Sequence, residues 1–229
     1  PLPTELSSPD IPVSTKLFDR NGKLLYEIYA GTRRSPVKID ELPDHIKNAT
    51  IAIEDKDFYK HSGFSFTGIA RSVYKIITRG KVEGGSTLTQ QLVKNALLSP
   101  ERTIRRKARE FFLTIIVEGI YSKDKILSMY LNQIPYGSTA YGIESASELY
   151  FGKPAKDLSL AEASLIAGLP QSPTRYSPFG AHPELASARQ KEVLNQMVKN
   201  GYINQEDADK ASNESLTYAE IKAPVAPHF

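Results

Sequence analysis

The sequence contains no cysteine, which excludes both disulfide bonds and metal sites built on thiolates. Histidine is scarce: the four histidines, at positions 45, 61, 182 and 228, are scattered, and no two have the spacing of metal ligands. The sequence therefore offers no metal site made by protein side chains alone.

Long hydrophobic runs are absent as well. None approaches the roughly 20 apolar residues of a membrane-spanning helix, and no signal peptide is visible. The chain begins and ends in proline-rich stretches, and we expect both ends to be cuts within a longer protein.

A strong excess of either charge is also missing. The net charge is only +3, and basic residues do not alternate with aromatic ones, which argues against a nucleic-acid partner. With 229 residues, of which 40% are hydrophobic, the chain suits one globular unit or two closely joined ones.

The first 40 residues are expected to be extended apart from a β-hairpin. Two apolar-rich runs within Lys16–Tyr29 flank Asn21-Gly22, the strongest short turn signal for a hairpin. Pro36–Ile39 is a candidate third strand. A helix should then begin near Pro43 and end at Glu54, because its apolar residues have helical spacing.

Helical patterns dominate the rest of the chain. Helices are expected over Ser122–Asn132, over Leu158–Leu169, over Pro183–Asn200 and after Asn204. The class is therefore mainly α. We divide the chain into residues 1–40, a main domain over 41–212, and the start of a proline-rich linker over 213–229.

The stretch Ile51–Gly63 contains the most suggestive carboxylates. The apolar run Ile51–Ile53 leads directly into Glu54 and Asp55. A carboxylate at the end of an apolar helix is partly desolvated, which raises its pKa toward the range of a general base. The alternative is an ordinary helix end with solvated acids.

Residues 84–98 combine a helix start with polar groups on one face. Thr87 followed by Gln90 fits a capping box. Two glycines precede this helix start, so backbone N–H groups could approach an anion there. Gln90, Gln91 and Lys94 share a face. The alternative is a capped surface helix.

Residues 101–121 join a basic face to an apolar run. Arg102, Arg106 and Arg109 cluster opposite an apolar stripe, and Glu110 lies beside Arg106. Such arginines would suit a polyphosphate. Phe111–Val117 is apolar nearly all round, which predicts a buried helix. The alternative for the charges is a solvated face with Arg–Glu pairs.

An apolar stripe over Phe64–Ile77 has basic residues alongside it. Arg71, Lys75 and Arg79 lie off the stripe. This pattern suits either a helix facing the core or a basic amphipathic helix at a membrane surface.

Four motifs together resemble those of family-51 peptidoglycan glycosyltransferases, the polymerase modules of class A penicillin-binding proteins and their monofunctional relatives. They occur in the family's order and spacing: EDKDFYKHSG, GGSTLTQQ, RKARE and KDKILSMYLN. The resemblance spans about residues 42–201. It implies a lysozyme-like large lobe with a smaller jaw subdomain that faces the membrane. The proline-rich tail then looks like a linker toward a transpeptidase domain.

The resemblance also assigns chemistry to the two glutamates. Glu54 matches the base that deprotonates the 4-hydroxyl of the acceptor sugar. That oxygen displaces undecaprenyl diphosphate from the growing chain, so that lipid II is polymerised into β-1,4 glycan by inversion. Glu110 matches a second glutamate near the departing diphosphate.

Cationic positions for the diphosphate follow from the same motifs. Lys94, Arg102 and Arg109 match residues that hold it; relatives often carry lysine where this chain has Arg109. No organic cofactor is implied. If a divalent ion binds, we expect Mg²⁺ or Mn²⁺ to bridge Glu110 and the diphosphate.

The remaining matched residues line or support the cleft. Asp55 is expected to orient the loop, and His61 is expected to be structural. The positions matched to the cleft lining are Phe58, Ser86, Gln90 and Gln91.

The resemblance further implies a place and partners. These are lipid II, the growing glycan chain, a membrane surface and a phosphoglycolipid inhibitor of the moenomycin type. The protein should act at the outer face of the bacterial cytoplasmic membrane, anchored by an N-terminal transmembrane helix outside this chain. Two alternatives remain, a lysozyme-like glycan hydrolase or lytic enzyme, and a non-enzymatic module that binds anionic lipid or nucleic acid.

Overall fold

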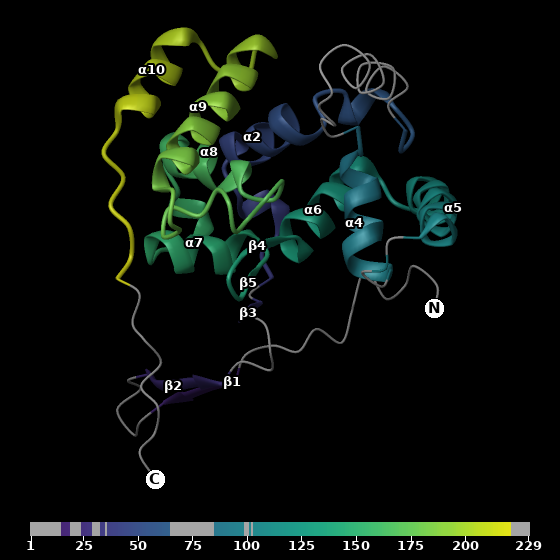
Figure 1. Ribbon diagram of the computed structural model, residues 1–229, viewed down its shortest axis with the longest axis horizontal. Coiled ribbons are helices and arrows are strands. Elements are labelled where there is room, and N and C mark those ends of the chain that lie inside the picture. The colour runs from purple at the N-terminus through teal and green to yellow at the C-terminus, as the bar shows by residue number, and fades with distance from the viewer. Residues whose placement is uncertain are drawn as a thin grey trace.

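Figure 1 shows the computed structural model of the chain, which is a body of helices with few strands. The structure describes residues 15–18, 24–28, 33–34, 36–64, 85–98, 101 and 103–220. The prediction of a mainly α fold is confirmed.

Four helices form one side of the body. They are α2 (Asp44–Glu54), α8 (Leu160–Gly168), α9 (Pro183–Lys199) and α10 (Gln205–Asn213). Small residues at the contacts let these helices approach closely, and α8 is buried on nearly every side. The alanines of this contact are Ala49, Ala52, Ala161, Ala167, Ala208 and Ala211.

The other helices surround a larger core. They are α4 (Leu88–Leu97), α5 (Ile104–Ile120), α6 (Lys123–Gln133) and α7 (Ile143–Phe151). α4 packs against both α5 and α6, as Figure 1 shows. α7 was not anticipated from the sequence.

Predicted helix starts are confirmed by their caps. The Thr87 hydroxyl accepts a hydrogen bond from the Gln90 backbone N–H, and the Gln90 side chain accepts one from the Thr87 backbone. Ser159 and Glu162 form the same reciprocal box at α8. α2 begins at Asp44, so Pro43 is the residue just before the helix and not, as expected from the sequence, its first residue. The two capping boxes satisfy backbone donors that a helix start leaves unpaired, whereas no side chain caps α2.

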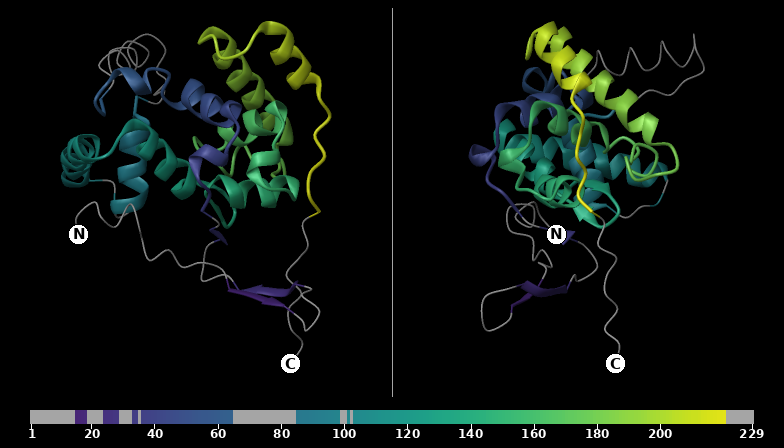
Figure 2. Two further views of the ribbon diagram at one scale, coloured as in Figure 1. Left: turned by 180° about the vertical axis from the view of Figure 1, so that it is seen from behind. Right: turned by 90° about the vertical axis from the view of Figure 1, so that its left-hand side faces the viewer.

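The strands form two small sheets. β1 (Thr15–Phe18) and β2 (Leu24–Ile28) pair antiparallel, which confirms the hairpin, and both views of Figure 2 place it apart from the helices. β3 (Arg33–Arg34) pairs parallel with β5 (Ala140–Tyr141), and β5 pairs antiparallel with β4 (Pro135–Gly137). Through this pairing, Arg33 and Arg34 are tied to the main body.

The expected third strand at Pro36–Ile39 is wrong. A short 3-10 helix, η1 (Ile39–Glu41), begins there. The backbone of Val37 is satisfied by a side chain instead of a strand: Asn132 accepts from its N–H at 2.8 Å and donates to its carbonyl at 2.9 Å.

The prediction that Phe111–Val117 is buried is also wrong. Within α5 only Glu110, Thr114 and Val117 are buried. α5 lies at the edge of the body, where Figure 1 shows α4 on one side of it. The residues turned outward are Ile104, Phe111, Phe112, Ile115, Ile116 and Ile120.

The segment after α10 packs onto the body. Tyr218 stacks on Phe151, with ring centroids 5.7 Å apart, and contacts Phe179 edge-on. The Ala219 N–H donates to the Tyr150 carbonyl at 2.9 Å. Residues 214–220, placed in the linker from sequence, are thus held against α7.

Several sequence predictions lie wholly or partly outside the described residues. The apolar stripe over 64–77 lies outside them beyond Phe64, the Asn21-Gly22 turn and Arg102 lie outside them entirely, and the predicted linker lies outside them from residue 221 on. Among the described residues, no helix combines the length and the apolar character needed to cross a membrane.

Candidate active site

Glu54 is the last residue of α2, and its side chain is only 8% exposed. The packing of α2 against α8 and α9 fixes the direction in which this helix ends. The following residue, Asp55, leaves the helical conformation, so Glu54 stands at the point where the backbone turns away. The apolar run before it therefore delivers a carboxylate to the edge of the core, as predicted.

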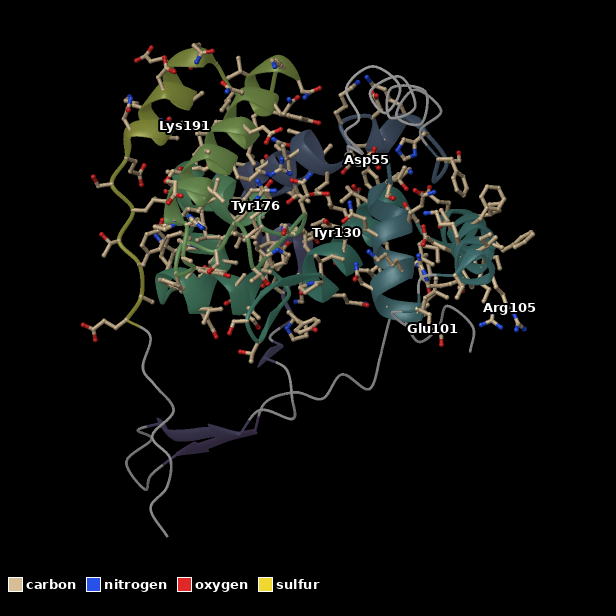
Figure 3. The ribbon with its side chains drawn as sticks, in the orientation of Figure 1. Asp55, Glu101, Arg105, Tyr130, Tyr176 and Lys191 are labelled. Carbon is tan, nitrogen blue, oxygen red and sulfur yellow. The ribbon has the colours of Figure 1, made fainter. Side chains whose placement is uncertain are left out.

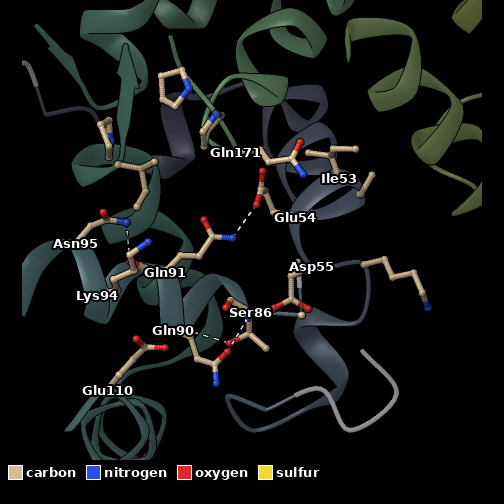
Figure 4. Close-up of a pocket in the computed structure, with 18 of the residues that line it drawn as sticks. Ile53, Glu54, Asp55, Ser86, Gln90, Gln91, Lys94, Asn95, Glu110 and Gln171 are labelled. Carbon is tan, nitrogen blue, oxygen red and sulfur yellow. Dashed lines mark hydrogen bonds between the residues drawn. The ribbon is translucent and has the colours of Figure 1, made fainter. Parts of the chain in front are cut away.

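One oxygen of Glu54 is held by a chain of side chains. The Gln91 amide donates to Glu54 Oε2 at 2.7 Å, and the Tyr130 hydroxyl donates to Gln91 Oε1 at 3.3 Å. Figure 4 shows the Glu54–Gln91 bond, and Figure 3 shows Tyr130 inside the helical body. The other oxygen, Glu54 Oε1, has no hydrogen-bond partner among the described residues.

Burial raises the pKa of Glu54 above its usual value, because a desolvated carboxyl resists ionisation. The hydrogen bond from Gln91 and the positive charge of Arg189 act in the opposite direction, and Asp55 adds to the increase. A carboxylate with a raised pKa and one unpaired oxygen has the properties of a general base.

Asp55 joins the loop after α2 to the start of α4. Its Oδ2 accepts from the Leu88 backbone N–H at 3.0 Å, and His61 Nε2 lies within 3.0 Å of both carboxylate oxygens. The Thr87 hydroxyl donates to the Gly63 carbonyl at 2.7 Å. Asp55 and His61 thus hold the loop, as expected from the sequence.

The second candidate carboxylate, Glu110, is 2% exposed and fully ion-paired. Arg106 Nη1 lies 2.9 Å from its Oε2, and Lys107 contacts its Oε1. All three residues lie within one turn and a half of α5, so the helix itself sets their geometry. The result is a group with one more positive than negative charge.

A pocket of about 560 Å³ joins the two glutamates. Figure 4 shows Lys94 and Gln91 between Glu54 and Glu110. The structure brings six of the nine predicted residues to this pocket: Glu54, Ser86, Gln90, Gln91, Lys94 and Glu110.

Of the other three predicted residues, Phe58 and Arg109 do not line the pocket, and Arg102 lies outside the part of the chain that the structure describes. The side chain of Phe58 is buried, and Lys123 Nζ lies 4.5 Å from the centre of its ring. Its predicted place in the cleft wall is therefore corrected to the core. Arg109 is exposed on α5 and is absent from the pocket lining.

Several pocket residues were not assigned from the sequence. Arg106 was one of the three arginines suggested for a polyphosphate from the sequence, but the family motifs assigned the diphosphate to Arg102 and Arg109 instead, and Lys107 was not considered. Both Arg106 and Lys107 line the pocket. Arg189 and Glu192 come from α9, far along the chain, and no local pattern marks them.

A divalent ion held by Glu110 does not fit this arrangement. Both carboxylate oxygens already contact cationic side chains, and no cluster of three acidic or histidine residues that could hold a metal occurs among the described residues. The predicted bridging of Mg²⁺ or Mn²⁺ between Glu110 and a diphosphate is not tested by the protein side chains alone and stays a prediction.

Comparison with known proteins decides the family. A family model described as transglycosylase matches residues 21–198. The chain belongs to the transglycosylase family. This confirms the family predicted from the four motifs.

The relatives that the chain matches include penicillin-binding proteins. It is 42% identical over 217 residues to penicillin-binding protein 1F of Bacillus subtilis, covering 94% of this chain and 30% of the relative. It is 44% identical over 218 residues to penicillin-binding protein 1A of Aquifex aeolicus, covering 95% of this chain and 30% of the relative. The transglycosylase chain thus spans about a third of the length of these relatives.

A solved structure shares the fold of the transglycosylase. The crystal structure of penicillin-binding protein 1A from Haemophilus influenzae matches with a TM-score of 0.54 and 24% identity, covering 91% of this chain and 21% of that chain. At this identity the likeness concerns the fold.

Proposed function

We propose that this chain is a peptidoglycan glycosyltransferase that polymerises lipid II into β-1,4 glycan for the bacterial cell wall. One observation carries the proposal: a single pocket contains a buried carboxylate with an unpaired oxygen and, apart from it, a cationic group. Membership of the transglycosylase family supports it.

In the proposed reaction, Glu54 Oε1 takes the proton of the acceptor 4-hydroxyl. The acceptor oxygen forms a bond to the anomeric carbon of the donor chain. The bond from that carbon to the diphosphate oxygen breaks, and its electron pair leaves with undecaprenyl diphosphate. Attack from the opposite face inverts α to β.

The cationic end of the pocket would stabilise the leaving group. Negative charge grows on the diphosphate as the bond breaks, and fixed positive charges favour that state over the ground state. Lys94, Arg106 and Lys107 line the pocket, and Glu110 holds the latter two; this supports the proposed role for them. Arg102 remains in the proposed site from its motif position.

A lysozyme-like hydrolase is disfavoured by the same cations. A glycan backbone has no diphosphate, so a hydrolase would gain nothing from three positive side chains in the pocket. The cations also suit a phosphoglycolipid inhibitor of the moenomycin type, which we propose binds there.

The outward face of α5 supports contact with a membrane surface. Phe112 is 65% exposed and Ile120 is 60% exposed on this helix, next to the pocket that Glu110 lines. Exposed apolar side chains in such number are typical of an interaction surface. We propose that the face lies against the outer surface of the cytoplasmic membrane, where lipid II resides.

Incubation of the chain with labelled lipid II in detergent tests the proposed activity. Glycan polymer is expected, and Glu54→Gln should form it at least about 10²-fold more slowly. Release of short fragments from preformed glycan would instead indicate the hydrolase, and failure to alter either substrate would contradict an enzymatic role.

A further inference from the structure

Arg189, on α9, is one of the residues that line the pocket, and it is only 7% exposed. Three neighbouring groups form a cradle that holds its side chain. Its Nε donates to the Gly168 carbonyl at 3.3 Å, and its Nη1 donates to Glu192 at 2.7 Å. Its guanidinium lies 5.5 Å from the ring centre of Tyr176. A side chain at Gly168 would begin 2.7 Å from Arg189 Cγ, so glycine is needed for the arginine to pass.

The cradle directs the guanidinium toward the unpaired oxygen of Glu54. Arg189 Nη2 lies 4.0 Å from Glu54 Oε1, which is close enough for strong attraction but too far for a hydrogen bond. Gln91 holds the opposite oxygen. The carboxylate is therefore fixed from one side and attracted from the other, and Oε1 keeps its capacity to accept a proton.

The other groups that face Glu54 supply no positive charge. Asp55 follows it on the chain, Tyr130 faces it from α6 and Tyr136 from β4, and all three act electrostatically with Glu54. Gln91 of α4 is neutral. Among the described groups that act on Glu54, Arg189 is the cation that offsets its burial.

We propose that Arg189 is a positioning residue that keeps Glu54 ionised and presents Oε1 to the pocket. The inference rests on the proposed role of Glu54 as the base. Glu192 weakens the attraction between Arg189 and Glu54, because it competes with Glu54 for the same guanidinium. Arg189 Nη2 therefore stays 4.0 Å from Glu54 Oε1.

Two variants should shift the acid limb of the plot of polymerisation kcat against pH in opposite directions. Arg189→Met removes the charge that favours ionised Glu54, so the acid limb should move to higher pH. At pH values below the wild-type limb, kcat should then fall about tenfold relative to wild type, and at high pH it should recover. Glu192→Gln frees the guanidinium for Glu54, so its limb should move to lower pH. Arg189→Lys should lie between wild type and Arg189→Met.

A readout without turnover separates this inference from the proposed function. Titration of δ-¹³C-labelled glutamate by NMR, with the Glu54 signal assigned through Glu54→Gln, should show the same opposite shifts. If the signal shifts but no variant or wild type forms polymer, the proposed function fails and the positioning role stands. Because Arg189→Met could unfold, Glu192→Gln, at an exposed side chain, provides the independent test.

Three results would overturn the inference. A raised KM with an unchanged acid limb would make Arg189 a substrate contact. An equal loss of kcat at every pH would make it a purely structural residue. Shifts of the same sign in Arg189→Met and Glu192→Gln would contradict the competition between the two glutamates.

Discussion

Glu54 and Glu110 are both buried carboxylates of one pocket, yet their surroundings differ. Glu54 ends a helix, receives one hydrogen bond from a neutral amide, and leaves Oε1 unpaired. Glu110 lies inside a helix, with Arg106 and Lys107 on its two oxygens.

The difference indicates that the two carboxylates have different roles in the pocket. A carboxylate with few partners and a raised pKa is available to take a proton, whereas one that is fully ion-paired is committed to holding its cations. In the proposed reaction, the base and the cations that Glu110 holds for the leaving group therefore lie on two different helices, α2 and α5.

Loss of the base should have the largest effect. Glu54→Gln should reduce polymerisation by about 10²–10⁴-fold, because an amide cannot accept the hydroxyl proton. Binding of a phosphoglycolipid inhibitor should change little, since the cationic end is intact. The measurement is the rate of lipid II consumption together with inhibitor affinity; near-normal turnover would remove Glu54 from the role of base.

The cationic end can be dissected by paired alanine variants. Arg106→Ala and Lys94→Ala should each lower turnover by roughly 10–100-fold and weaken the inhibitor, because they remove charge stabilisation from the leaving group. Arg109→Ala, on the same helix as Arg106 but exposed and away from the pocket lining, is the matched control.

The motif position of Arg109 and its place in the structure lead to different expectations. A loss in Arg109→Ala equal to that in Arg106→Ala would favour the assignment made from the motif. A change in stability within about 0.5 kcal/mol, with turnover unchanged, would favour the structural placement.

Local signals in the sequence predicted much of this site. The capping box at Thr87 and the apolar run before Glu54 are contained in a few adjacent residues, and both have the predicted form. Arg189 reaches the site only because α9 packs beside α2, so no local pattern could assign it. Tyr130 belongs to the quoted KDKILSMYLN motif, but its contact with Gln91 depends on the packing of α6 beside α4.

Hydrophobic patterns predicted helices better than they predicted burial. Phe111 and Phe112 suggested a core helix, but apolar character does not reveal whether a neighbour covers the face. Phe58 shows the opposite error, since an aromatic residue expected at the cleft is covered by its own loop and Lys123.

The exposed apolar face of α5 is a second way in which this helix differs from α2, and contact of this face with lipid can be tested. Phe112→Glu and Ile120→Glu should reduce co-sedimentation with anionic liposomes several-fold, because each places a charge on an apolar surface that meets lipid. Both side chains are exposed, so the fold should persist in circular dichroism. Glu220→Gln, at an exposed position far along the chain, is the control. Unchanged sedimentation would exclude this face as the lipid contact.

The smallest effect concerns stability and pH. Burial raises the pKa of Glu54, so between the ordinary glutamate value and the raised value the folded state binds more protons than the unfolded chain. The free energy of unfolding must therefore fall as pH rises through that window and stay reduced above it. Glu54→Gln removes this loss and should be more stable than wild type at pH 7, by on the order of 1 kcal/mol.

Urea unfolding of wild type and Glu54→Gln at a series of pH values measures this difference. The two curves should converge below the ordinary pKa of glutamate, where Glu54 is protonated in both states. Glu220→Gln should follow wild type throughout. If Glu54→Gln is less stable than wild type at pH 7, the attraction of Arg189 outweighs burial, and Glu54 resembles Glu110 more than the structure indicates.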